Sequence, residues 1–474
     1  MSNRVLLTAA LVVVLLVGLG QCSALLREMV VLRPRPLPTP AVVPPAAPTA
    51  DSRPATPAEP FQTALGGRSR DTAPTVQAGD TQTLATGWNA FALRLLGAQP
   101  RDANLCFSPY SAAACLTMCY AGARGETARQ MAGVLGLTLP AERLHPAANR
   151  LDQDLAALER APSKIELKLA NAVWSDKSIQ PLPDFLDVLS VNYGAGLKLV
   201  DFKGAPEPSR AAINQWVADQ TKGHITDLLA PGTIDSLTRL ALTNAVYLLA
   251  PWQKPFDAKL TAPGPFTRAD GTAVQTPLMH ARGLPAPYAK GDDWTAVQLP
   301  YSDPNLALLL VLPAGKLADF EAKLSADRLT AIVDRLKPER LNLTLPSFEQ
   351  RSNLHLAAAL QSLGMTDAFD HLKADFTGMF PPSPVWIGAV EHQAWIKTDR
   401  KGTTAAAATA APMAGKAEPA PAFRHLRFDR PFLFVVRHTP SRVVLFLGRV
   451  ADPSSGGPAR GPAPREGAPP TDAK

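Results

Sequence analysis

The sequence contains very little cysteine and none of the short motifs that mark common catalytic sites. It has no Gly-x-Ser-x-Gly motif for a hydrolase nucleophile, and no serine is followed three residues later by lysine. His-Glu-x-x-His, the phosphate-binding loop and Gly-x-Gly-x-x-Gly are also absent, and the eight histidines are scattered. We therefore expect a protein that is not an enzyme and that binds no cofactor.

Only four cysteines occur in 474 residues, namely Cys22, Cys106, Cys115 and Cys119. The spacing of the last three matches no known metal-site pattern. Cys115 and Cys119 are four residues apart, so they would share one face of a helix. We expect these three side chains to be small buried apolar groups rather than a disulfide framework, and we expect no metal site.

The chain also lacks a strong charge imbalance. Its 48 lysines and arginines and 41 acidic residues give a net charge of +7, spread without a dense basic run. The usual signature of nucleic-acid or heparin binding is therefore missing. The 47 prolines, in contrast, crowd into residues 33–60 and 452–470. This distribution predicts one folded domain over residues 81–453, a proline-rich disordered tether over 25–80 and a disordered tail over 454–474.

Residues 1–24 have the features of an export signal. Arg4 supplies the positive start, and residues 5–19 form an apolar core that is short for a membrane span. Three alternatives remain open at its end: lipidation of Cys22 in a lipoprotein box, cleavage after Ala24, or an uncleaved anchor. Glutamine precedes Cys22, where the lipoprotein pattern normally has a small residue. All three alternatives predict an exported protein, either secreted or held at a cell surface or in the periplasm.

An unusual alanine-rich stretch follows the strand-like residues 384–390 and precedes two further strand-like runs, 432–436 and 443–447. Residues 402–421 read GTTAAAATAAPMAGKAEPAP, with almost no large apolar side chain to anchor them in a core. Residues 405–411 contain no glycine, proline or charge, so nothing in them prevents regular structure. On composition alone, a flexible linker or a short helix is as good an interpretation as an exposed loop.

Hydrophobic periodicity predicts a mixed α+β fold. Ser108 is placed to cap a helix, and Pro109 suits its first turn. Helices are predicted at residues 83–97, 112–121, 211–222 and 353–363, and strands at 165–174, 240–249, 296–300, 305–313 and 341–346.

Four blocks of sequence together resemble the serpins. They are N-L-C-F-S-P-Y-S with Y-A-G-A-R-G-E-T-A-R-Q-M within residues 104–131, T-N-A-V-Y with W and P-F within 243–256, G-T-T-A-A-A-A-T at 402–409, and F-D-R-P-F-L-F at 428–434. The resemblance runs from about residue 83 to 452. It implies an α+β fold with a large, mostly antiparallel central sheet, two smaller sheets, about eight or nine helices and an exposed reactive loop.

The resemblance assigns roles within the loop. Its hinge, which becomes a new central strand after a protease cuts the loop, would comprise Gly402, Thr403, Thr404, Ala405, Ala406, Ala407, Ala408 and Thr409. The bond that is cut would be Lys416–Ala417, which suits a trypsin-like protease. Because the loop is longer than usual after this bond, Met413 is a rival. Arg400 stands where the family usually has glutamate, and Pro412 lies just beyond the hinge.

Five further residues receive roles from the same resemblance. Ser108, Ser111, Asn244 and His392 would form a hydrogen-bonded cluster under the sheet where it opens. Trp252 would lie near the point at which the loop enters. Each residue also has a simpler interpretation: the serines as helix caps, the asparagine as a turn residue and the tryptophan as core.

The main hypothesis is an exported, monomeric inhibitor that traps a serine protease as a covalent acyl complex and binds no nucleic acid. A first alternative is a non-inhibitory member of the same family that acts as a binding or carrier protein. A second is a cell-surface hydrolase or adhesion domain on a proline-rich tether, against which the missing motifs argue.

Overall fold

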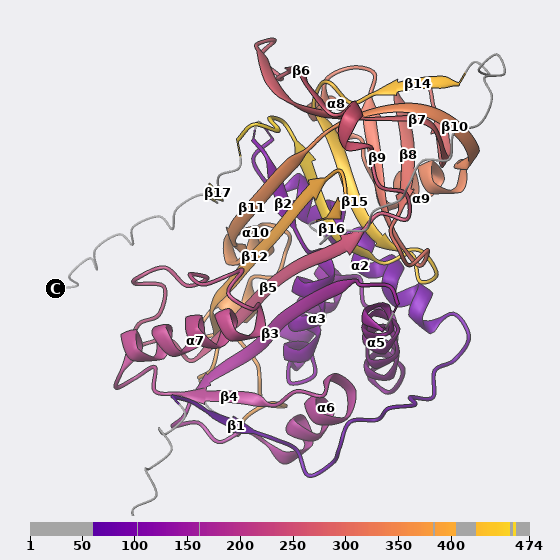
Figure 1. Cartoon of the computed structure of the whole chain (residues 1–474). Helices are drawn as coiled ribbons and strands as arrows, with labels where there is room; N and C mark the ends of the chain where they lie inside the picture. The colour runs from indigo at the N-terminus through magenta and orange to yellow at the C-terminus, as the bar shows by residue number, and fades with distance from the viewer. Residues whose placement is uncertain are drawn as a thin grey trace, which may run out of the picture. The chain divides into compact units, whose positions relative to one another are not determined.

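Two β-sheets with helices packed on them form the described part of the chain (Figure 1). The structure is a computed structural model that describes residues 60–101, 103–160, 162–382, 384–403, 423–455 and 458–460. Within these ranges there are nine α-helices, which agrees with the α+β class expected from the sequence. They are α2 (Asp80–Gly97), α3 (Pro109–Tyr120), α4 (Gly125–Leu135), α5 (Ala141–Ala156), α6 (Pro183–Tyr193), α7 (Pro206–Gln220), α8 (Leu317–Ala322), α9 (Ala326–Asp334) and α10 (Leu356–Ser362).

The central sheet has eight strands in the order β1-β4-β3-β5-β13-β12-β11-β17. Their bounds are β1 (Gln62–Ala64), β3 (Glu166–Asp176), β4 (Leu197–Val200), β5 (Leu240–Pro251), β11 (Phe348–His355), β12 (Ile387–Asp399), β13 (Gly402–Thr403) and β17 (Pro458–Arg460). Most neighbouring strands are antiparallel, as expected. The exception at the centre is β5, which pairs in parallel with β12 as far as Tyr247 and Trp395. Beyond that point β13 lies between the two strands and pairs antiparallel with both.

Both faces of the central sheet are buried, because successive side chains of a strand point to opposite sides. On β5, Leu242 and Val246 belong to the main core, together with residues of α2 and α3. The alternate residue Ala245 belongs to a second core with Ile213 and Val217 of α7. The sheet therefore has a main-core face and an α7 face, with α3 and α7 on opposite sides of β3 (Figure 1).

The remaining strands form a nine-stranded second sheet, in the order β14-β10-β7-β8-β9-β15-β16-β2, with β6 pairing only with β7. Their bounds are β2 (Leu105–Phe107), β6 (Ala262–Thr267), β7 (Ala273–Lys290), β8 (Trp294–Pro300), β9 (Leu306–Pro313), β10 (Lys337–Pro346), β14 (Arg424–Arg427), β15 (Phe432–His438) and β16 (Val444–Val450). The resemblance implied two smaller sheets, and here they are continuous through the long strand β7. A bulge interrupts β7 where Arg282 and Gly283 together face Asn342. Gly283 has a φ of +57°, and the bulge bends β7 so that this one strand belongs to both of the smaller sheets.

Helix α3 begins as the sequence predicts. The Ser108 hydroxyl oxygen accepts a hydrogen bond from the Ser111 backbone nitrogen at 3.2 Å, and Pro109 is the first helical residue. Cys115 and Cys119 are completely buried in this helix, and both thiols are free. Desolvation raises the pKa of both thiols, so they remain neutral and behave as the small apolar side chains that we expected.

Residues 60–80, which we expected in the disordered tether, belong to the folded domain. Strand β1 pairs antiparallel with β4, and the ring of Phe61 packs edge-to-face on Trp174 with 5.3 Å between ring centroids. Farther along, Arg70 Nη2 lies 2.5 Å from Asp152 Oδ2 of α5. The distribution of prolines therefore predicted the start of the folded domain at the wrong residue. This segment is held mainly by strand pairing and by contacts with distant residues, which proline content does not reveal.

Two other expectations need correction. Residues 458–460, which we placed in a disordered tail, form β17 and pair in parallel with β11. The helix predicted at 353–363 begins later, because Asn353 and His355 still pair with β12 as the end of β11. Helix α2, in contrast, starts one turn earlier than predicted. The rest of the expected tether, tail and export signal lies outside the described residues.

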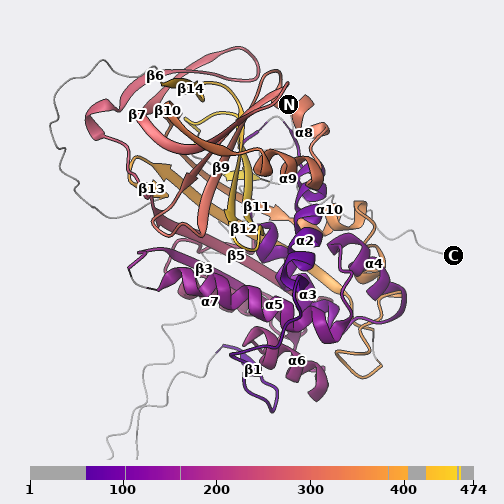
Figure 2. The ribbon, with the colours of Figure 1, turned by 90° about the vertical axis from the view of Figure 1, so that its right-hand side faces the viewer.

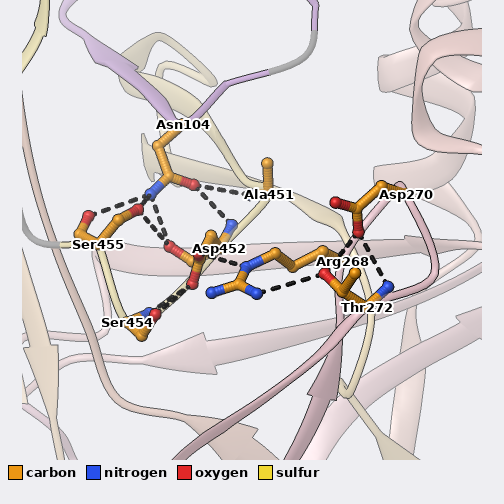
Figure 3. A network of polar contacts seen from close by, with 8 residues as sticks. All are labelled: Asn104, Arg268, Asp270, Thr272, Ala451, Asp452, Ser454 and Ser455. Carbon is orange, nitrogen blue, oxygen red and sulfur yellow. Dashed lines mark hydrogen bonds and ion pairs between the residues drawn. The ribbon is translucent and has the colours of Figure 1, made fainter.

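A polar network fastens the end of β16 to the turn between β6 and β7 (Figure 3). The Asn104 side-chain oxygen accepts hydrogen bonds from the backbone nitrogens of Ala451 and Asp452, at 2.7 and 2.9 Å. Arg268 Nε lies 2.5 Å from Asp452 Oδ2, and the Ser454 hydroxyl donates to the other carboxylate oxygen at 2.7 Å. Burial tends to raise the pKa of Asp452, but hydrogen bonds from Ser454 and Arg268 outweigh it and lower that pKa.

We predict that Arg268→Ala lowers the free energy of unfolding by about 1 kcal/mol at neutral pH, because it removes the charged partner of Asp452. The folded-state pKa of Asp452 is lowered, so its contribution is present above the unfolded-state pKa and disappears as the pH falls through the folded-state pKa. Urea unfolding at neutral and acidic pH measures both effects.

Arg129→Ala is the matched control. Arg129 pairs with Glu126 on the surface of α4, where the side chains are 74% and 47% exposed, compared with 33% and 20% for the Arg268–Asp452 pair. Removal of the exposed pair should cost less than removal of the Arg268–Asp452 pair, because water screens it more strongly. Equal losses in the two variants would contradict a specific role for Arg268.

Candidate functional site

The first two residues of the predicted hinge, Gly402 and Thr403, form β13 inside the central sheet (Figure 2). Thr403 lies between Thr398 of β12 and Ala250 of β5. Gly402 has a φ of +153°, and a Cβ atom there would lie 2.2 Å from the Ala250 carbonyl oxygen. The close approach of the two backbones therefore requires glycine. The hinge begins in an inserted position.

Thr403 is fixed on the main-core face by an aromatic pair. Its hydroxyl oxygen lies 2.7 Å from the Tyr301 hydroxyl oxygen, and both side chains are completely buried. The Tyr301 ring stacks on Trp252 with 4.7 Å between centroids, and Trp252 Nε1 donates to the Asp399 carbonyl oxygen at 2.8 Å. Burial raises the pKa of Tyr301, so its hydroxyl keeps the proton needed for this hydrogen bond. The structure thus brings Trp252 next to the hinge.

The turn that leads into the hinge is held by backbone atoms. The carbonyl oxygen of Arg400 accepts from the Phe256 nitrogen at 2.8 Å, and that of Lys401 accepts from the Trp252 nitrogen at 3.0 Å. The Asp399 carboxylate accepts from the Lys401 nitrogen at 2.7 Å. Because the Arg400 side chain is exposed and the turn uses only its backbone, an arginine in place of the usual glutamate leaves this geometry intact.

The structure brings together the four residues that the resemblance places under the sheet. His392 Nε2 accepts a hydrogen bond from the Ser108 backbone nitrogen at 2.9 Å, which makes Nδ1 the protonated ring nitrogen. Asn244 lies directly opposite His392 in the parallel register of β5 and β12. Complete burial lowers the pKa of His392 to about 3, so the ring is neutral. Ser111 Oγ donates to Asn171 Oδ1 of β3 at 2.5 Å.

Two members of this cluster carry polar atoms without hydrogen bonds. Among the described residues, His392 Nδ1 has no hydrogen-bond partner, and the side-chain amide of Asn244 has none apart from the Cys115 sulfur, whose pKa it acts to lower. Each such group costs free energy when it is buried. The cluster is therefore a place where a change in the sheet could recover stability.

Sequence reasoning missed Asn171 and Tyr301. Asn171 occupies an ordinary position in an alternating strand, and Tyr301 lies between the strands predicted at 296–300 and 305–313. Neither position carries a local pattern that points to its partner, because Ser111 is 60 residues away from Asn171 and Thr403 is 102 residues away from Tyr301. Only the pairing of distant strands brings these groups together.

Several predicted site residues lie outside the described part of the chain. These are Cys22, the remainder of the hinge from Thr404 to Thr409, and the expected cleavage site Lys416–Ala417 with its rival Met413. Across the ranges that are described, no group of three His, Cys, Asp or Glu side chains could hold a metal ion. No helix in those ranges is both long enough and apolar enough to cross a membrane.

Comparison with known proteins identifies the family. The family model described as "Serpin (serine protease inhibitor)" matches residues 86–453. A leukocyte elastase inhibitor of Sus scrofa is 35% identical over 362 residues, which cover 74% of this chain and 93% of the relative. A serpin-like protein of Thermococcus kodakarensis is 35% identical over 360 residues, which cover 74% of this chain and 82% of the relative. The chain belongs to the serpin family.

Solved structures show the same fold. The thermophilic serpin tengpin in its native state matches with a TM-score of 0.73 and 24% identity, over 83% of this chain and 99% of tengpin. Uncleaved ovalbumin matches with a TM-score of 0.71 and 24% identity, over 78% of this chain and 100% of ovalbumin. The serpin fold implied by the sequence blocks is confirmed.

We predict that Tyr301→Phe lowers the free energy of unfolding by about 1 to 3 kcal/mol, because it leaves the buried Thr403 hydroxyl without a partner. Thr403→Val should lower the free energy of unfolding by a similar amount, because it leaves the buried Tyr301 hydroxyl without a partner. The double variant should lose about 1 kcal/mol less unfolding free energy than the sum of the two single losses. A double-mutant cycle with urea unfolding measures this difference. Additive losses would show that the two hydroxyls do not interact.

Proposed function

We propose that this protein inhibits a serine protease as a suicide substrate and does not itself catalyse turnover. The protease cuts the loop that follows Thr403, and the hinge then continues into the central sheet between β5 and β12. The observation that carries the proposal is β13, which pairs antiparallel with both strands and so marks the path of insertion. The description of the matching family and the names of the relatives support protease inhibition.

The free energy for this step comes from the sheet. Insertion replaces one parallel pairing with two antiparallel pairings, which are somewhat more stable per residue. It also moves apart the strands that carry Asn244 and His392, and the register of β13 continued along them places Thr409 between the two, so that its hydroxyl can bond their polar atoms. The native fold is therefore a metastable state that loop cleavage releases.

Insertion would inactivate the protease by displacement. About fourteen inserted residues, at roughly 3.3 Å each, move the attached protease by roughly 45 Å. The protease is held as an ester between its catalytic serine and the loop, and pulling on this acyl-enzyme distorts the active site before water can hydrolyse the ester. The partner is thus held in a covalent complex with one monomeric inhibitor.

The loop sequence indicates the class of protease. Lys416 before the expected scissile bond fits a trypsin-like pocket that carries an acidic residue, and we propose Lys416–Ala417 as this bond. Met413 is the rival, because the loop is long after this point. Several relatives are named as inhibitors of an elastase, and that target belongs to those proteins. In this protein the residue at the cleaved bond decides which protease is the target.

We predict that the protein forms an SDS-stable complex with trypsin and that Thr403→Arg turns it into a substrate. Thr403 is already buried in β13, so an arginine at this position would drive the start of the hinge out of the sheet and oppose its insertion, because the core offers no partner for its charge. Gel electrophoresis after mixing with trypsin measures the fraction of complex and of cleaved inhibitor.

Thr404→Arg is the matched control, because the next residue of an inserted strand points to the α7 face beside Lys397 of β12, whose side chain is 43% exposed. This variant should still form the complex. Cleavage of the wild type without complex would exclude the inhibitory mechanism and favour a non-inhibitory binding or carrier protein. Complex formation by Thr403→Arg at the level of wild type would contradict insertion.

We also propose that residues 1–24 export the protein and that Cys22 carries a lipid anchor. At about 3.1 Å per residue, an extended tether over residues 33–59 would hold the domain up to roughly 80 Å from a membrane. Such an inhibitor would protect a cell surface against external proteases.

We predict that the full chain, expressed in a Gram-negative host, partitions with membranes and that Cys22→Ala moves it to the soluble exported fraction. Fractionation followed by immunoblotting measures the distribution. Ser23→Ala, next to the proposed lipid site, is the control and should leave the distribution unchanged. If the wild type is already wholly soluble outside the cytoplasm, the lipid anchor is excluded and a secreted inhibitor remains.

A further inference from the structure

The connection between α7 and β5 is folded tightly onto the α7 face of the central sheet. Just after α7, Lys222 and Gly223 have positive φ values of +49° and +77°, which reverse the chain and direct His224 toward the sheet. Lys222 Nζ lies 2.6 Å from Glu166 Oε1 of β3 and fastens the turn. The position of His224 is therefore set by the backbone and by an ion pair.

His224 contacts the two strands that must separate during insertion. Its ring centroid lies 4.5 Å from that of Tyr247 on β5 and 4.6 Å from that of Trp395 on β12, and it stacks on the tryptophan at an interplanar angle of 18°. Tyr247 and Trp395 are direct partners in the parallel register, with 6.4 Å between their ring centroids. The imidazole thus bridges the boundary between β5 and β12, which we call the seam.

This bridge belongs to a row of contacts that crosses four strands. The Tyr247 hydroxyl is hydrogen-bonded to Glu166 of β3. On the other side, Trp395 Nε1 donates to Glu349 Oε1 of β11 at 3.0 Å. In this row a side-chain hydrogen bond joins β3 to β5, and another joins β11 to β12. His224, which lies outside the sheet, contacts both β5 and β12 across the seam.

The register of β13 shows what insertion would do to the bridge. Thr403 pairs with Ala250 of β5 and with the residue three positions beyond Trp395 on β12, both in antiparallel register. Continued for three residues, the same register places Ala406 between Tyr247 and Trp395. Because Ala406 is three positions after Thr403, an odd offset, its side chain would point to the α7 face, where the His224 ring lies.

Insertion at this level is incompatible with the present position of His224. Neighbouring strands lie about 4.8 Å apart, so a strand placed between β5 and β12 would separate them to roughly twice that distance. A single imidazole could no longer contact Tyr247 and Trp395 together. Ala406 is only the third residue after the inserted Thr403, so the bridge is met almost as soon as insertion proceeds.

We propose that His224 is a positioning residue that holds the seam closed through Tyr247 and Trp395 and thereby sets the rate of loop insertion. This inference rests on the proposed inhibitory function. An aromatic pair of this kind is strong enough to change the rate about three- to tenfold when one ring is removed. The bridge exists in the native state and is absent after insertion, so its removal favours insertion kinetically without changing the inserted product.

The test measures insertion in wild type and in His224→Ala, mixed with excess trypsin in a stopped-flow instrument. Tryptophan fluorescence should report a first-order phase that no longer depends on trypsin concentration, and this phase should be about three- to tenfold faster in the variant. His224→Phe, which keeps a ring at this position, should restore the wild-type rate. His224→Gln provides a second variant without a ring if the alanine variant does not fold.

His371→Ala is the matched control. His371 packs on Trp386 with 5.9 Å between ring centroids, and this pair does not bridge β5 and β12. The control should insert at the wild-type rate. Rates within twofold of each other for wild type, His224→Ala and His224→Gln would overturn the role of His224, as would an equal acceleration by His371→Ala.

Melting temperatures separate this inference from the proposed function. Cleavage of the loop should raise the melting temperature of every variant, and the cleaved forms of wild type and His224→Ala should melt together. If cleaved wild type gains no stability, insertion does not occur, and both the proposed function and this inference are wrong. If it gains stability but ringless variants insert at the wild-type rate, only the inference about His224 is wrong.

Discussion

The parallel pairing between β5 and β12 is the constraint on which the rest of the structure depends. It stands in the middle of a mostly antiparallel sheet, and it is the pairing that β13 has already displaced at one end. A parallel ladder is the weaker of the two kinds of pairing, so this fold keeps a replaceable contact at its centre. The hinge, the polar cluster around His392 and the turn after α7 all lie along the boundary between β5 and β12.

Side chains on the two faces of the sheet hold β5 and β12 together in different ways. On the main-core face, Thr403 is bound to Tyr301, and the buried cluster with His392 and Asn244 combines firm hydrogen bonds with polar atoms that lack them. On the α7 face, the contacts that cross the seam are between rings and can be broken without leaving a charge buried. Under the proposed mechanism, the main-core face holds the polar groups that the native pairing leaves unpaired, and the α7 face slows the separation of β5 and β12.

Patterns that depend on near neighbours were predictable from the sequence. The cap at Ser108, the buried cysteines of α3 and the alternating strands follow from local spacing, and the serpin resemblance pointed to Gly402, where β13 begins. Contacts between distant segments were not predictable. Neither Tyr301 nor His224 stands in a pattern that names its partner, and residues 60–80 seemed unstructured because three strand residues are too few to show alternation. The helix predicted from residue 353 began too early for a related reason: pairing with β12 extends β11 to His355.

Strands β1 and β17, which come from opposite ends of the chain, are the outer strands of the central sheet, and each is only three residues long. An open sheet edge offers unpaired amide and carbonyl groups to any other extended chain, and proteins commonly cover such edges to avoid self-association. Under the proposed mechanism the sheet has a particular need for this protection, because it would accept an extra strand from its own loop and refuse strands from other molecules. With both margins occupied, the opening beside β13 is the place where a strand donated by a second copy would compete with the molecule's own loop.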